Sequence, residues 1–167
     1  MDYFDLIEKR HSVRSFKGDD IEDGKLQKIL EAARLAPTAV NKQAFKIFVI
    51  HTKGKEDVLK NIYSKDWFVK APIIIGVCSM QNKSWVRRDG VNYGFVDAAI
   101  VMDHIVLAAT SLGLGACWIG AFDVSSAKKY LNLEEGIEPV AFTPIGYEDK
   151  SSYKKIRKDI DEIVTYL

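Results

Sequence analysis

Cysteine is scarce in this chain. Two occur among 167 residues, Cys78 and Cys117, and each lies in an apolar run. This pattern predicts buried thiols in a reducing compartment and argues against a disulfide framework. Neither cysteine has metal-ligand spacing to any of the three histidines, so we expect no bound metal.

An excess of charge of one sign is also missing. Lys and Arg number 24 against 23 Asp and Glu, which leaves a net charge of +1 at pH 7. This balance gives no electrostatic basis for binding nucleic acid or an anionic membrane surface. The acidic N-terminus lacks the basic and then apolar layout of a secretion signal. The expected location is therefore the cytoplasm.

Long apolar runs are rare, and one needs a check against a membrane span. Residues 105–122 carry no charge over 18 positions, the lower limit for a spanning helix. Three glycines interrupt the second half of this run, which favours a helix that ends there and is followed by a strand. We therefore expect no membrane partner.

No linker, internal repeat or low-complexity tract divides the chain, so residues 1–167 are expected to form a single domain. The predicted fold class is α+β, a central mixed sheet flanked by helices in three layers, α/β/α. Pro144 interrupts the last predicted strand, which indicates that this strand is bent or lies at an edge. Hydrophobic spacing predicts helices near residues 2–9, 22–36, 58–62, 93–112 and 124–131, and strands near residues 45–50, 72–78, 116–119 and 140–147.

The predicted helix 93–112 is apolar around most of its circumference. Such a helix needs cover on nearly every side, and in a chain this short a second subunit supplies that cover most simply. The preceding stretch, residues 80–93, is polar but contains Trp85 and Tyr93. It is typical of a mobile loop or lid.

Arg10, His11, Ser12 and Arg14 fall within five residues. If this basic segment, residues 10–14, is extended, then Arg10, Ser12 and Arg14 point the same way. Two guanidinium groups flanking a hydroxyl suit the oxygens of a phosphate or another planar anion. A solvated basic turn is the simpler alternative.

Three further segments bear on the same ligand. Residues 37–43 join a helix to a strand with small and polar side chains, which let backbone groups approach a flat ligand. Residues 112–120 have the order helix, glycines, strand, the reverse of a dinucleotide-binding motif. Residues 154–158 form a second basic cluster. Taken singly, each is equally consistent with an ordinary loop, a helix cap or a solvated patch.

In this order, the segments resemble the nitroreductase family of FMN-dependent oxidoreductases. Residues 10–16 are similar to its N-terminal flavin-binding signature, and residues 36–43 to its Pro-Ser-Ala/Ser-x-Asn-x-Gln segment. Residues 97–120 resemble its central helix and the following strand, and residues 144–164 its C-terminal pattern. Ala44 and Phe45 stand where the family usually has Pro and Trp.

The resemblance implies a homodimer with FMN at the subunit interface. It implies that Arg10, His11, Ser12, Lys155 and Arg157 hold the FMN phosphate, and that Arg14 reaches the pyrimidine end of the flavin ring. It further implies ring contacts from Pro37, Thr38, Ala39 and Asn41 of the partner subunit and packing by Trp118 and Ile119. A backbone N–H near Gly120 would bond flavin N5.

The expected function is an FMN-dependent NAD(P)H oxidoreductase that reduces nitroaromatics, quinones or similar acceptors by a ping-pong mechanism. No protein side chain is assigned as a nucleophile or general acid, because the flavin carries the chemistry. Two alternatives remain open. One is a specialised flavin reaction, such as reductive dehalogenation or substrate dehydrogenation, and the other is a flavin-binding sensor without turnover.

Overall fold

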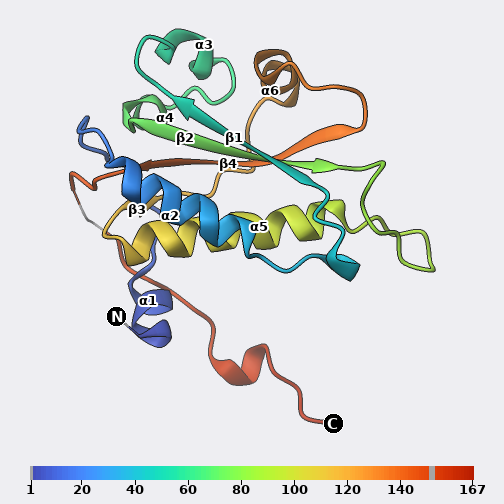
Figure 1. Cartoon of the computed structure of the whole chain (residues 1–167). Coiled ribbons are helices and arrows are strands. Elements are labelled where there is room, and N and C mark those ends of the chain that lie inside the picture. Colours follow the sequence, from blue (N-terminus) through green and yellow to red (C-terminus); the bar gives the residue numbers. More distant parts are fainter. Residues whose placement is uncertain (1, 151–152) are drawn as a thin grey trace.

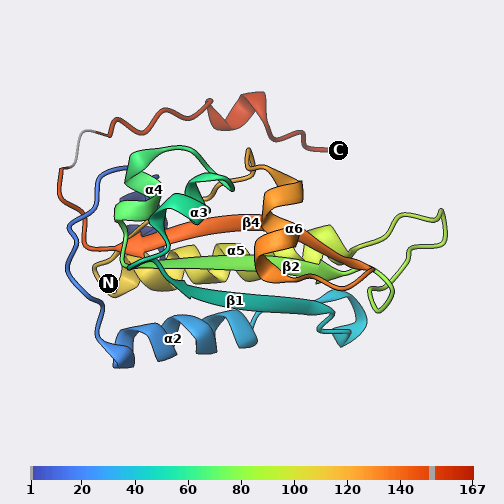
Figure 2. The ribbon, with the colours of Figure 1, turned by 90° about the horizontal axis from the view of Figure 1, so that it is seen from above.

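The computed structural model describes residues 2–150 and 153–167, and it has three layers (Figure 1). Helices α2 (Asp23–Arg34) and α5 (Gly94–Ser111) cover one face of a four-stranded sheet. The short helices α3 (Glu56–Lys60) and α4 (Asp66–Lys70) and the helix α6 (Val124–Leu131) cover the other face, as Figure 2 also shows. The α+β class and the α/β/α layering are therefore confirmed.

The sheet contains β1 (Phe45–His51), β2 (Ile73–Met80), β3 (Gly115–Ala116) and β4 (Ile137–Gly146). Their order is β1-β2-β4-β3, and all three pairs of named strands are antiparallel. In the described residues, the parallel pairing that makes the sheet mixed is confined to one bridge between Ser12 and Ala116. The N-terminal segment thus joins the sheet next to β3.

Pro144 lies in an interior strand, so of the two predicted alternatives, a bent strand or an edge strand, the edge strand is wrong. β4 runs between β2 and β3. The backbone of Phe142 forms two hydrogen bonds with that of Ile119, at 2.8 and 3.0 Å. Pro144 is two residues further along β4, so its nitrogen faces the same neighbouring segment as the N–H of Phe142. The ladder is interrupted there, because the N–H of Cys117 donates to Thr143 Oγ1 at 3.2 Å. A proline fits since no donor is required at that point.

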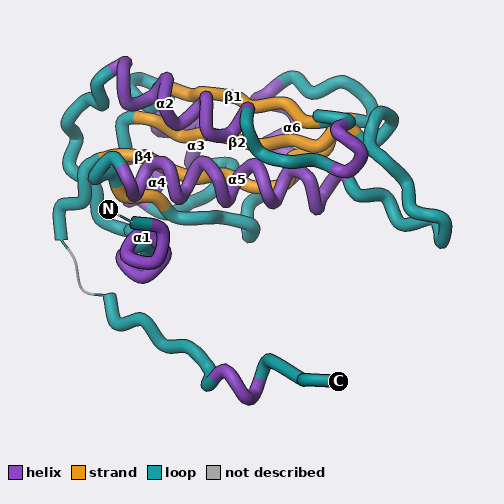
Figure 3. The backbone as a smooth tube through the Cα atoms, turned by 60° about the horizontal axis from the view of Figure 1, so that its bottom comes forward, coloured by secondary structure: helices purple, strands orange, loops and turns teal. Residues whose placement is uncertain are grey.

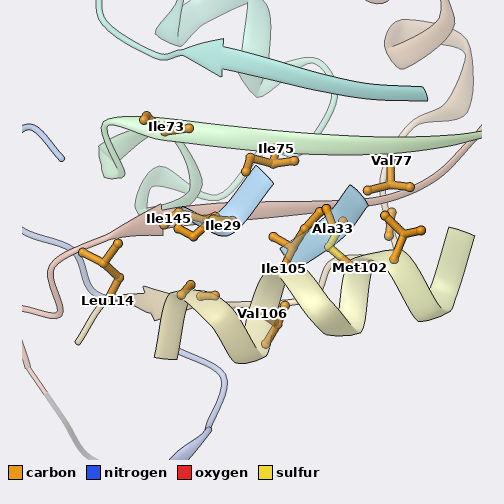
Figure 4. Close-up of a cluster of buried hydrophobic side chains, with 14 of the residues drawn as sticks. Ile29, Ala33, Ile73, Ile75, Val77, Met102, Ile105, Val106, Leu114 and Ile145 are labelled. Carbon is orange, nitrogen blue, oxygen red and sulfur yellow. The ribbon is translucent and has the colours of Figure 1, made fainter. Parts of the chain in front are cut away.

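The main core lies between the sheet and the two long helices (Figure 4). Ile75 and Val77 from β2 pack with Met102 and Ile105 from α5, and all four side chains are completely buried. By length and composition alone α5 could cross a membrane. In the structure it is a core helix whose buried side packs on its own sheet.

The opposite side of α5 is less covered. Phe95, Val96 and Asp103 are exposed, whereas Val101 and Ile105 are buried within the chain. The sequence predicted that α5 would be covered on nearly every side. Within one chain, the sheet and α2 cover one side of it. The exposed side remains free to meet another molecule.

Residues 81–93 form a small hairpin that projects from one end of the molecule (Figures 1 and 2). Its strands are held by a bridge between Val86 and Asn92 and by a hydrogen bond from Tyr93 N–H to the carbonyl of Trp85 at 2.9 Å. Arg87 donates to Asp89 and to the Tyr93 hydroxyl. The expected mobile loop is thus an internally bonded hairpin.

The C-terminal tail, residues 153–167, runs away from the layered body and contains a 3₁₀ turn, η2 (Ile160–Glu162) (Figure 3). It lies on the same side as α1 (Tyr3–Lys9), whose first turn is capped by the Asp2 side chain. Ser151 and Ser152, the start of the predicted C-terminal segment, lie outside the described residues, as does Met1.

Gly115 allows the basic segment to approach β3. A Cβ added at Gly115 would lie 2.8–2.9 Å from side-chain atoms of Val13, which is buried. We expect Gly115→Ala to lower the free energy of unfolding by about 1–3 kcal/mol, the usual cost of overpacking. Denaturant unfolding followed by circular dichroism measures this.

The matched control is Gly24→Ala. An added Cβ at Gly24 meets no atom within 4 Å, and the residue lies in helix α2. This substitution should leave stability unchanged or raise it slightly, because alanine is the better helix former. Equal stability of the Gly115→Ala protein and the wild type would contradict the close contact.

Candidate functional site

The basic segment is extended and lies beside β3. Val13 donates its N–H to the carbonyl of Ala116 at 3.0 Å, and the side chains of Val13 and Phe16 are buried. Because side chains alternate along an extended chain, Ser12 and Arg14 turn to the opposite side. Arg14 is exposed and Ser12 is partly exposed. The exposure of Ser12 and Arg14 agrees with the predicted alternation, whereas Arg10 lines a different pocket from these two side chains.

His11 is held by two acceptors. Its Nδ1 lies 3.1 Å from the carbonyl oxygen of Lys9, and its Nε2 lies 2.9 Å from Oε1 of Glu148. Its ring also stacks on Tyr153, with centroids 5.3 Å apart. Both ring nitrogens thus face oxygen atoms, one from the backbone and one from a carboxylate. His11 thereby links the basic segment to the chain after β4 and to the tail.

Three predicted cations line one groove of about 530 Å³. Arg10 comes from the basic segment, and Lys155 and Arg157 come from the tail. The Lys155 ammonium group donates to the carbonyl oxygens of Ile7 and Glu8, the latter at 2.9 Å. These carbonyls belong to the last turn of α1, where a cation is favoured. The tail is thus fixed beside Arg10 by a helix C-terminus.

Ser12 and Arg14 line a second pocket together with Tyr153. Cys117 lies next to them, and burial raises the pKa of its thiol above the usual value, while Arg14, Ser12 and Arg10 oppose that rise. The thiol is therefore neutral at pH 7. The basic segment thus contributes Arg10 to the groove and Ser12 and Arg14 to the second pocket.

The residues that follow β3 divide between surface and core. Trp118 is 40% exposed, whereas the Ile119 side chain is buried in a second core cluster beside Phe142. Any contact that Ile119 makes with a ligand must therefore come from its backbone. Gly120 has open space where a Cβ would lie, which leaves its backbone accessible.

The other predicted flavin contacts lie elsewhere. Residues 37–43 include the 3₁₀ turn η1 (Ala39–Asn41), and Ala39 donates its N–H to Asp97, in the first turn of α5. The pocket beside His11 is lined by Thr110, at the other end of α5. Thirteen residues of helix separate Asp97 from Thr110, or about 20 Å. Within one chain, the loop after α2 and the helix α1 that precedes the basic segment lie at opposite ends of α5, as Figure 1 shows.

The sequence reasoning missed Asp97, Glu148 and Tyr153. Asp97 is a carboxylate in an otherwise apolar helix, a signal that was available in the sequence. Glu148 and Tyr153 reach His11 only after the chain folds back from β4, so no local pattern marks them.

Comparisons with known proteins agree with this fold. The model of the Nitroreductase family matches residues 7–71 and 60–147. A nitroreductase family protein from Clostridium difficile 630 has a crystal structure with a TM-score of 0.92 and 34% identity, covering 99% of this chain and 98% of that one. An FMN-dependent nitroreductase from Clostridium difficile R20291 has a TM-score of 0.80 and 26% identity, with 96% of each chain covered.

A curated relative points the same way. The NADPH-dependent oxidoreductase of Staphylococcus haemolyticus is 27% identical over 178 residues, which cover 96% of this chain and 71% of that protein. The family model spans well over half of the present chain, and the fold, the basic segment and the segment around β3 occur in the order that the resemblance required. The chain therefore belongs to the nitroreductase family of NAD(P)H oxidoreductases.

Proposed function

We propose that this protein is a homodimeric FMN enzyme that transfers electrons from NAD(P)H to nitroaromatics, quinones or similar acceptors in a ping-pong mechanism. The observation that carries the proposal is the groove shared by Arg10, Lys155 and Arg157, with Ser12 and Arg14 following Arg10 in the same segment. Guanidinium, ammonium and hydroxyl donors are the groups that bind a phosphate monoester. Their number suits one phosphate of FMN, and the expected location is the cytoplasm.

The position of the loop at residues 37–43 supports a dimeric site. In one chain, this loop is tied to Asp97, about 20 Å along α5 from Thr110 in the pocket beside His11. A two-fold axis that sets α5 antiparallel to its copy would bring the loop of one subunit beside the groove of the other. Pro37, Thr38, Ala39 and Asn41 would then contact a flavin ring whose phosphate is held across the interface.

Exposed apolar side chains support the same assembly. Phe4 of α1 is 76% exposed and Ile156 of the tail is 74% exposed, and both belong to segments that extend from the body. On α5, Phe95 and Val96 are exposed beside the fixed loop. Apolar surface of this extent is typical of an interface, and a second copy is the partner that the antiparallel arrangement requires.

When bound, FMN supplies the hydride chemistry, taking two electrons from NAD(P)H and passing them to the acceptor. The chain's own residues bind and orient. Arg10, Lys155 and Arg157 neutralise the phosphate, with His11 placed between the groove and Glu148. Arg14 would supply positive charge toward the pyrimidine end of the ring, and Trp118 with the backbone at Ile119 and Gly120 would contact it.

The purified protein should be yellow and bind one FMN per chain, and NAD(P)H should bleach it until a quinone or nitroaromatic restores the colour. Arg10→Ala should weaken FMN binding about ten- to a hundredfold, because it removes a charge-assisted contact. Fluorescence titration of the apoprotein with FMN measures this. Arg34→Ala, which removes an arginine paired with Glu31 on α2, should bind like the wild type. A colourless protein with no FMN affinity would refute the proposal.

The dimer can be tested on the exposed side of α5. Val96 is 44% exposed, and Val96→Asp should weaken dimerisation at least tenfold, since it buries an unpaired charge at the interface. Val58→Asp is the matched control, because Val58 is 42% exposed on α3 in the opposite layer. Sedimentation velocity over a concentration series separates the two. A monomeric wild type that binds FMN stoichiometrically would exclude the shared site.

Arg14 should affect the flavin potential more than the affinity. Its charge favours the anionic reduced flavin, so Arg14→Gln should lower the two-electron potential by some tens of millivolts, 30 mV corresponding to about 1.4 kcal/mol. Arg14→Lys, which keeps the charge, should shift the potential less. Potentiometric titration decides, and an unshifted potential with weakened FMN binding would assign Arg14 to the phosphate.

A further inference from the structure

The loop between α2 and β1 has an unusual backbone. Three of its non-glycine residues have positive φ: Val40 at 44°, Asn41 at 57° and Gln43 at 51°. Asparagine tolerates this left-handed region, but a β-branched residue such as Val40 does so only under constraint. Each non-glycine residue in this region costs free energy, and it keeps that conformation only where contacts with the surrounding structure offset the cost. Something outside the local sequence must therefore hold this loop.

Asp97 is the side chain that reaches the loop from the body of the protein. Its Oδ1 accepts the N–H of Ala39 at 2.8 Å. Other bonds are internal to the loop: Gln43 N–H donates to Thr38 Oγ1 at 3.0 Å, Asn41 N–H donates to the Thr38 carbonyl at 3.0 Å, and Lys42 N–H donates to the Ala39 carbonyl at 3.1 Å. Among these hydrogen bonds, the one from Ala39 to Asp97 connects the turn η1 to helix α5. It is a charge-assisted hydrogen bond, which is stronger than a neutral one.

The burial of Asp97 is costly for the fold. The residue is 1% exposed, and among the described residues its Oδ2 has no hydrogen-bond partner. An apolar side chain would fill the same place in α5 without an unsatisfied acceptor. Its position in the first turn of α5 offsets part of the cost, because the helix N-terminus favours a negative charge. The carboxylate therefore has a role that core packing does not explain.

We propose that Asp97 is a positioning residue for the flavin site, which acts by holding the strained loop at residues 38–43 in the conformation that contacts FMN bound to the other subunit. This inference rests on the function proposed above. Asp97 itself does not touch the flavin. It fixes Ala39, and through Ala39 the left-handed turn at Val40 and Asn41.

The first experiment compares Asp97→Ala with Asp97→Asn. Asp97→Ala removes the acceptor, so FMN should dissociate about ten- to a hundredfold more readily, and the visible circular dichroism of the bound flavin should change. Asp97→Asn keeps an oxygen at the same distance and should restore most of the affinity and the wild-type spectrum. Asp103→Ala is the matched control, because Asp103 is an exposed aspartate on the same helix.

The second experiment tests the strain directly. Glycine adopts positive φ at no steric cost, so Val40→Gly should make the loop less dependent on Asp97. In the Val40→Gly background, Asp97→Ala should therefore weaken FMN binding several-fold less than it does in the wild type. This double-mutant cycle measures the coupling free energy between the Asp97 carboxylate and the loop. If Asp97→Ala acted only by a general loss of stability, that coupling free energy would be zero.

The outcomes separate this inference from the proposed function. A wild type that binds no FMN overturns both. Normal FMN binding with unchanged affinity and spectrum in Asp97→Ala, or a coupling of zero with Val40→Gly, overturns the role of Asp97 alone. If Asp97→Ala fails to fold, Ala39→Pro removes the same hydrogen bond from the loop side, since the preceding Thr38 is already extended as proline requires. Unchanged binding and spectrum in that variant also overturn the role.

Discussion

The contact between the N-terminal segment and β3 determines the form of the candidate site. Val13 donates to Ala116 and packs its side chain over Gly115, where no Cβ intervenes. With Val13 buried, alternation turns Ser12 and Arg14 outward. The same pairing leads His11 to Glu148 and Arg10 to the groove shared with the tail. A basic stretch that would otherwise be a solvated turn becomes a fixed array of donors.

Helix α5 sets the second constraint, because it separates the two halves of the candidate site. Its C-terminal end lies at the pocket beside His11, and its first turn holds the loop through Asp97. Within one chain, these two ends are about 20 Å apart. In the assembly proposed here, a second copy supplies the missing half, so catalysis depends on dimerisation, and the strain in the loop is maintained by a residue of the core helix.

Much of the fold followed from local patterns. The continuous apolar run 72–78 predicted a central strand and the 3.6-residue spacing predicted the helices, and both were confirmed by β2, α2 and α5. Pro144 suggested an edge strand wrongly, because the interruption that accommodates it is made by Cys117 and Thr143, 26 positions apart in the chain. The Ile119 side chain was expected to pack against the ligand, but it is buried in the second core cluster instead.

The sequence by itself determined the main helices and strands, the small net charge and the family signature. These properties depend on composition and on residue spacing within short windows. Only the tertiary structure decided which cations share a groove, because Arg10 and Lys155 lie 145 positions apart and meet through the last turn of α1. It also decided that the loop is strained and tied to Asp97, since neither backbone torsion nor burial of one carboxylate oxygen is encoded by local spacing. Long-range packing fixes both.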